Sequence, residues 1–71
     1  MLQHKITLIE AKATAYGTYC VRVQYENGEA TIFGDSRVLA GANKMTTQYT
    51  NMMRKNGALA DNFKQIKLAA A

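Results

Sequence analysis

The 71-residue sequence contains no proline and no tryptophan, and it has only one cysteine and one histidine. Because Cys20 has no second cysteine to pair with, no internal disulfide can form, and this favours a reducing compartment. One cysteine and one histidine cannot supply the four ligands of a structural zinc site. The sequence therefore predicts no metal and no other cofactor, and glycine and asparagine must provide the turn signals.

Long hydrophobic runs are also absent. No stretch approaches the ~20 apolar residues that a membrane-spanning helix needs. The first fourteen residues carry His4, Lys5, Glu10 and Lys12, which argues against a signal peptide. We therefore expect a cytoplasmic protein with no membrane partner.

Acidic residues are fewer than basic ones: nine lysines and arginines against five aspartates and glutamates give a net charge of +4. The last five residues, KLAAA, resemble translated vector sequence, so we interpret 67–71 as a vector-derived tag remnant and 1–66 as one small α+β domain. A chain of this length buries only about 60% of its unfolded surface. Its stability should be marginal, which favours dimerisation or docking onto a partner.

The first half of the sequence has the alternation typical of strands. Leu2, Ile6 and Leu8 share one face of a predicted strand, and the pattern changes face near Ile9, where we expect a bulge or, alternatively, a break that ends around Tyr16-Gly17. Residues 18–25 alternate cleanly and lead into Asn27-Gly28, the pair that a type I′ hairpin turn needs. This turn predicts a register with Tyr25 opposite Ala30, Val23 opposite Ile32 and Arg22 opposite Phe33.

From Ser36 onward the apolar spacing changes to that of a helix, which should end at Asn56-Gly57. Beyond it, Leu59, Phe63 and Ile66 have spacings of four and three, which favours a short second helix, with a terminal strand as the alternative. The prediction is an α+β fold in which a small antiparallel sheet of two to three strands packs on one main helix. The predicted core is Ile6, Leu8, Val21, Val23, Ile32, Val38, Ala42, Met45, Tyr49 and Met52.

Gly34-Asp35-Ser36 resembles the nucleophile segment of the GDSL lipases and esterases, in which the serine attacks an ester. Arg37 follows where that family has leucine, and the only histidine, His4, lies upstream of the serine and not downstream. A serine nucleophile requires such a base. We therefore expect Asp35 or Ser36 to cap the helix N-terminus instead, and we expect no enzyme activity.

Two binding hypotheses remain. The first is a small protein-binding regulator or inhibitor, of the kind frequent among phage and mobile-element products, that uses a helix face or a sheet edge. Met53 is its expected exposed contact, because methionine adapts to varied partners. A third possibility, ranked below both binding hypotheses, is a structural subunit that self-associates through its sheet edge, which would make a homodimer.

The second hypothesis is a nucleic-acid-binding protein. The predicted register places Arg22 beside Phe33 on the outer sheet face, where a basic and an aromatic side chain would contact phosphates and stack bases. Further positive charge comes from Arg37, Lys44, Arg54 and Lys55.

Overall fold

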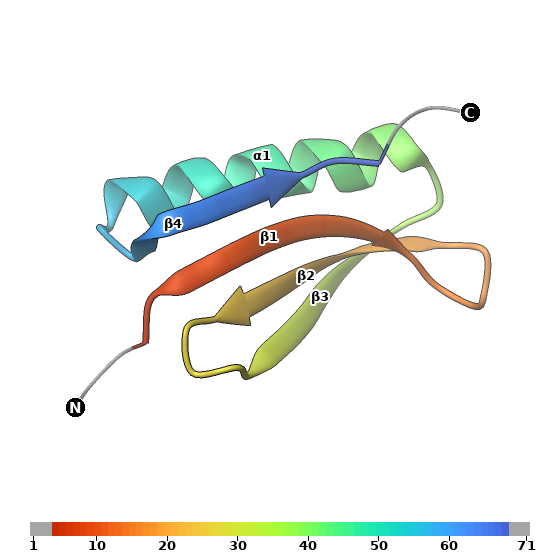
Figure 1. Ribbon diagram of the computed structural model, residues 1–71. Helices are drawn as coiled ribbons and strands as arrows, with labels where there is room; N and C mark the ends of the chain where they lie inside the picture. Colours follow the sequence, from red (N-terminus) through yellow and green to blue (C-terminus); the bar gives the residue numbers. More distant parts are fainter. Residues whose placement is uncertain (1–3, 69–71) are drawn as a thin grey trace.

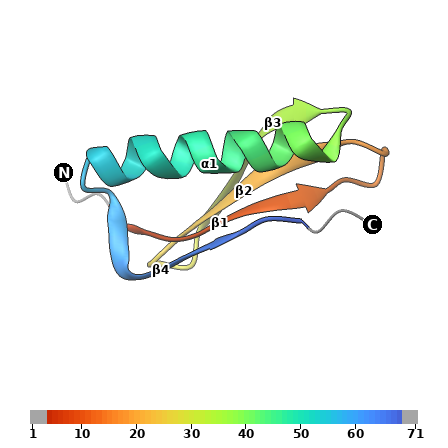
Figure 2. The same ribbon diagram turned by 90° about the horizontal axis from the view of Figure 1, so that it is seen from above.

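The computed structural model describes residues 4–68 as one four-stranded sheet with a single helix against one face (Figure 1). The elements, in chain order, are β1 (Ile6–Ala13), β2 (Tyr19–Tyr25), β3 (Ala30–Ser36), α1 (Leu39–Lys55) and β4 (Leu59–Ile66). The strand order is β3-β2-β1-β4, and α1 runs along the sheet in both views (Figure 2).

The α+β class and the packing of the sheet on one main helix are thus confirmed. The sheet has four strands and is mixed, because β1, β2 and β3 are antiparallel whereas β4 is parallel to β1. It therefore differs from the predicted two- to three-stranded antiparallel sheet. Leu2 and residues 69–71 of the predicted tag remnant lie outside the described residues.

The C-terminal element is a strand, not the favoured short helix. Leu59 pairs with Ile6 on β1, and Leu59 and Phe63 pack against the core. The spacing of these two residues fits a helix turn, but it also fits one face of a strand, where every second residue points the same way. The long crossover through α1 brings the chain back parallel to β1, as parallel pairing requires.

A bulge in β1 decides which isoleucines and leucines are buried. The pairing of β1 with both neighbours shifts between Ile6 and Leu8, two residues before the expected position. After the shift, Ile9 faces the helix and is fully buried, whereas Leu8 is half-buried beside Gln24 on the other face. Leu8 was therefore wrongly assigned to the core, and Ile9 takes its place.

Two threonines form, together with Ala42, the most buried part of α1. Thr46 and Thr50 are almost completely inaccessible, and their hydroxyls donate to the carbonyls of Ala42 and Thr46 at 2.9 and 2.8 Å. These bonds satisfy the hydroxyl groups within the helix, so the threonines can be buried at little cost.

Because Thr46 and Thr50 are buried, the buried face of α1 is rotated away from the one predicted, on which Val38, Met45 and Met52 belonged to the core. Met53 packs against the core, whereas Met52 is 50% exposed and Val38 is 60% exposed. Val38 and Met52 were therefore wrongly assigned to the core. Met53 was wrongly assigned to the exposed surface.

The two ends of α1 differ in how closely they match the prediction. At the start, the N-cap position is Val38 and has no side-chain cap; the Ser36 hydroxyl instead accepts from the Val38 N–H at 3.2 Å and donates to its carbonyl at 2.9 Å. The predicted Asp35 or Ser36 cap is therefore wrong. At the end, Gly57 adopts a positive φ of 69°, and Ala58 N–H donates to the Met53 carbonyl. This Schellman-type stop is the one predicted.

We expect Ile9→Ala to lower the free energy of unfolding by about 2–4 kcal/mol, because it opens a cavity in the core. Leu8→Ala, the matched control on the other face, should cost about 1 kcal/mol or less. Urea denaturation followed by circular dichroism measures both. Equal losses for the two variants would contradict the position of the β1 bulge.

Candidate functional site

The turn between β2 and β3 determines what β3 presents to each face. Gly28 N–H donates to the Tyr25 carbonyl at 3.0 Å, and Tyr25 N–H donates to the Glu29 carbonyl at 2.8 Å. Among the described residues only glycines have positive φ, so Asn27 does not, while Gly28 has a φ of 90°. This is a three-residue loop, a type I turn followed by a glycine bulge, and not the predicted type I′ turn.

The longer loop shifts the register of β3 by one residue. Val23 pairs with Thr31, Arg22 with Ile32 and Val21 with Phe33. Since a one-residue shift moves every side chain to the opposite face, the predicted faces of β3 are reversed.

Phe33 consequently faces the helix, where its ring lies 4.6 Å from that of Tyr49, centroid to centroid. Ile32, which was wrongly assigned to the core, is on the outer face and 64% exposed. The predicted pairing of Arg22 with Phe33 is also wrong, because the two residues lie on opposite faces of the sheet.

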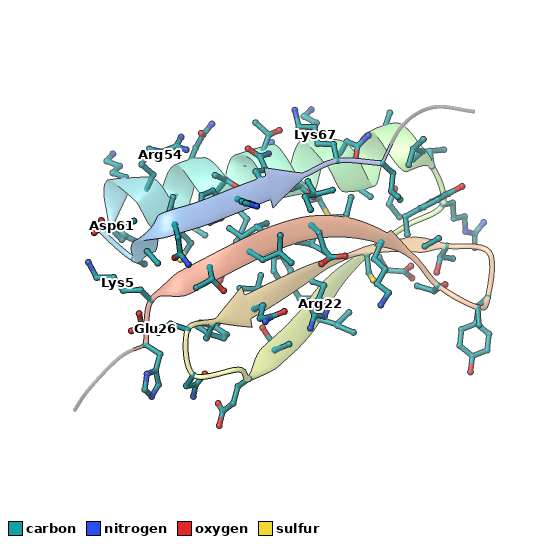
Figure 3. All side chains as sticks on the ribbon, viewed as in Figure 1. Lys5, Arg22, Glu26, Arg54, Asp61 and Lys67 are labelled. Atoms are coloured by element: carbon teal, nitrogen blue, oxygen red, sulfur yellow. The ribbon has the colours of Figure 1, made fainter. Side chains whose placement is uncertain are left out.

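The predicted basic residues do not converge on one surface. The Arg22 guanidinium lies 3.4 Å from a carboxylate oxygen of Glu10 and donates to the side-chain carbonyl oxygen of Gln24 at 2.9 Å. These contacts hold the guanidinium within the outer sheet face. Arg54 projects on the helix side of the molecule, away from Arg22 (Figure 3). Lys44 and Arg54 are ten residues apart on α1, or about 15 Å along its axis. Arg37, Lys44, Arg54 and Lys55 are all exposed.

An apolar groove lies between α1 and β3. Its volume is about 230 Å³, and its lining residues are Phe33, Met45, Gln48, Tyr49 and Met52. Gly34 is required here, since its φ is 78° and a Cβ atom would lie 3.1 Å from the Met45 sulfur. The close approach of Met45 to the Gly34 backbone therefore helps to form this groove, which we call the α1–β3 groove.

A second hollow of about 370 Å³ adjoins the first at Tyr49, which lines both. It lies beside the β2–β3 turn, and its other lining residues are His4, Ile6, Tyr25, Asn27, Glu29, Met53 and Ala58. Burial raises the pKa of Tyr49 above its ordinary value, and the neighbouring Tyr25 adds to the shift. Tyr49 is thus the residue that joins the two hollows.

Among residues 4–68, no strand other than β2 pairs with β3, so the outer edge of β3 is open to them. Because Tyr25 and Glu29 form a hydrogen-bonded pair, the strict alternation of an antiparallel ladder directs the N–H and C=O groups of Ala30 and Ile32 away from β2. Residues 30–35 are all exposed, and no charged side chain occurs before Asp35. Native edge strands are usually protected by charge or proline, so β3 is available for pairing.

The other edge strand, β4, is better protected. It carries Asp61 and Lys64, and Gln65 donates to the Thr47 hydroxyl of α1 at 3.4 Å. The Asn43 side chain forms two hydrogen bonds with the backbone of Leu68, at 2.9 and 3.0 Å. These bonds hold the end of the described chain against the helix; the vector origin of 67–71 stays a prediction.

Ser36 and His4 lie at opposite ends of the sheet. Ser36 pairs with Tyr19 at the start of β2, while Lys5, next to His4, accepts from Glu26 N–H just past its end. Six residues of strand separate these points, or about 20 Å. The esterase-like segment therefore has no histidine base within reach among residues 4–68.

Nor do these residues place three metal-binding side chains together, and α1 is too short and polar to cross a membrane.

No protein-family model matches the chain, and neither a curated protein nor a solved structure does. The site therefore rests on its own geometry. Met45 and Tyr49 were predicted as core residues, so the α1–β3 groove was missed; the uncharged run Ala30–Gly34 is the sequence signal that would have indicated an open edge.

We expect the free energy of unfolding to fall above about pH 10, and to fall less steeply in Tyr49→Phe. The raised pKa means that the unfolded chain loses this proton first as the pH rises, so the stabilising contribution of Tyr49 is present below pH 10 and is lost above it. Tyr49→Phe keeps the tilted ring contact with Phe33 and removes the titrating group. Urea denaturation between pH 8 and 11 measures this, and an identical fall in both proteins would contradict it.

Proposed function

We propose that this chain is a small, non-enzymatic protein-binding module that binds its partner through the β3 edge and the α1–β3 groove. The observation that carries the proposal is the open edge of β3, whose residues 30–34 are uncharged and exposed and include the apolar side chains of Ile32 and Phe33. A role as a regulator or inhibitor, of the phage or mobile-element kind and in the cytoplasm, belongs to the same proposal. Its support is the small size of the chain.

The backbone of β3 supports a mode in which the partner adds a strand. The outward groups of Ala30 and Ile32 offer main-chain hydrogen bonds to an extended segment. Such bonds give affinity without sequence specificity, so side chains next to the edge must select the partner.

The α1–β3 groove supports that selectivity. Phe33 and Met52 are partly exposed beside the edge, at 36% and 50%, and Met45 lines the groove between them. Methionine side chains are flexible and polarisable, so they adapt to different apolar partners. A bound strand would place alternate side chains toward this groove and toward Ile32 on the outer face.

Capture of partners from host lysate tests the proposal with matched variants. We expect Ile32→Lys and Met52→Lys each to reduce the captured partner at least tenfold, because each places a charge in the proposed interface. Asn51→Lys adds the same charge on the exposed side of α1, next to Met52 in sequence, and should leave capture unchanged. Equal capture by all three variants, with folding verified by circular dichroism, would rule out this surface.

Nucleic-acid binding has one supporting observation: the predicted contact residues Arg37, Lys44, Arg54 and Lys55 are among the exposed basic residues of a chain of net charge +4. If all four contacted phosphates of a single strand, affinity would fall roughly 50-fold between 50 and 200 mM salt. Because Arg22 and Phe33 lie on opposite faces of the sheet, these two residues do not form the predicted basic and aromatic surface. We therefore expect no binding of single-stranded DNA or RNA at 200 mM salt in a fluorescence anisotropy titration; tight, salt-resistant binding would contradict this.

A further inference from the structure

We infer that the strand that occupies the β3 edge is β3 of a second copy of this chain, antiparallel and centred on Ile32. This inference rests on the proposed function, because it names the partner of the same edge. The result would be a two-fold symmetric dimer with one continuous eight-stranded sheet.

The direction of the backbone groups supports this register. In a two-fold antiparallel pair centred on Ile32, Ile32 faces Ile32 of the second copy, and Ala30 faces Gly34. The Ile32 N–H and C=O groups already point out of the sheet, so each copy can donate to and accept from the other. The positive φ of Gly34 and the shift of the β2–β3 pairing beyond Phe33 end the regular part of the edge, which keeps the contact centred near Ile32.

The side chains on both faces suit such self-pairing. On the outer face, Ile32 is the most exposed large apolar residue of β3, and it would be covered by its own copy. On the helix face, Phe33 would lie beside Thr31 of the second copy, which would cover the exposed part of its ring. Residues 30–34 carry no charge, so like-charge repulsion is confined to the two ends of the contact, where Glu29 would lie opposite Asp35 of the second copy.

Symmetry and stability favour a second copy over open-ended assembly. The two-fold contact uses β3 twice and leaves β4, with Asp61 and Lys64, at both outer edges. Pairing β3 with β4 would instead continue without closing and produce fibres. Among residues 4–68, the hydrophobic core contains four fully buried large apolar side chains, so a chain of this size gains stability from association.

Sedimentation equilibrium from about 1 µM to 1 mM tests the inference, since a single short strand pair is a small interface and should be weak. We expect the wild-type chain to reach twice the mass of the 7.8 kDa monomer within this range. Ile32→Lys and Ile32→Glu should each raise the dissociation constant of the dimer at least tenfold, because like charges would meet at the two-fold axis. A one-to-one mixture of the two variants should restore the dimer.

Ile32→Pro provides an independent measurement. It removes an N–H group that does not bond to β2, so the fold should be kept while the dimer is lost; Ile32→Val, which keeps the N–H and most of the side chain, should remain dimeric. A wild-type chain that stays monomeric to about 1 mM, or a lysine–glutamate mixture that stays monomeric, would overturn the inference. If such a monomer still captured a different protein in an Ile32-dependent way, the inference would fail while the proposed function stood.

Discussion

The three-residue loop between β2 and β3 is the constraint on which the rest of the surface depends. The positive φ of Gly28 allows the chain to bulge after a type I turn, and this sets β3 one residue away from the register of a two-residue turn. Because side chains alternate between faces, the shift places Phe33 under α1 and Ile32 outside. This one-residue shift in register therefore determines which β3 side chains line the α1–β3 groove and which lie on the outer face of the open edge.

A second constraint acts through the helix. Thr46 and Thr50 can lie at the centre of the buried face only because each hydroxyl donates to a carbonyl one turn back. Their small volume lets the helix approach the sheet closely over β1 and β2, where Ile9, Val21 and Val23 are fully buried. The larger side chains of Met45, Tyr49 and Met53 then flank this contact, and Met45 and Tyr49 line the groove.

Local signals in the sequence were sufficient for the hairpin strands and the main helix, but not for the C-terminal strand β4 or for the faces of the elements. The hairpin near Asn27-Gly28, the helix and its stop at Gly57 depend on residues close together in the chain, and the structure has all three. The exposure of Leu8 depends on the β1 bulge, that of Ile32 on the type of the β2–β3 turn, and that of Met52 on the buried threonines of α1. Each of these features shifts a periodic pattern by one position. Periodicity cannot detect such a shift, because the alternation before and after it is equally regular.

The same reasoning explains why the candidate site was only half predicted. The sequence indicated a sheet edge or a helix face as the binding surface. Phe33 was predicted as a contact residue, but on the outer face of the sheet, whereas it lies on the helix side. Met45 and Tyr49 were assigned to the core because they lie on the apolar side of α1, which is where the structure has them as half-buried residues. Whether such residues are covered depends on the width of the sheet beneath them, which only the arrangement of all four strands determines.

That width also accounts for the position of the groove. Four strands about 4.8 Å apart make a sheet wider than one helix of about 10 Å diameter can cover, so some of the helix-side face must remain open. On the β4 side, Gln65 and Leu68 reach the helix through hydrogen bonds to Thr47 and Asn43, and they close that flank. On the β3 side, the ring contact of Phe33 with Tyr49 and the approach of Met45 to Gly34 leave a hollow. A sheet with one helix thus concentrates its uncovered apolar surface beside the strand whose edge is also unprotected, and a partner that adds a strand there would cover both.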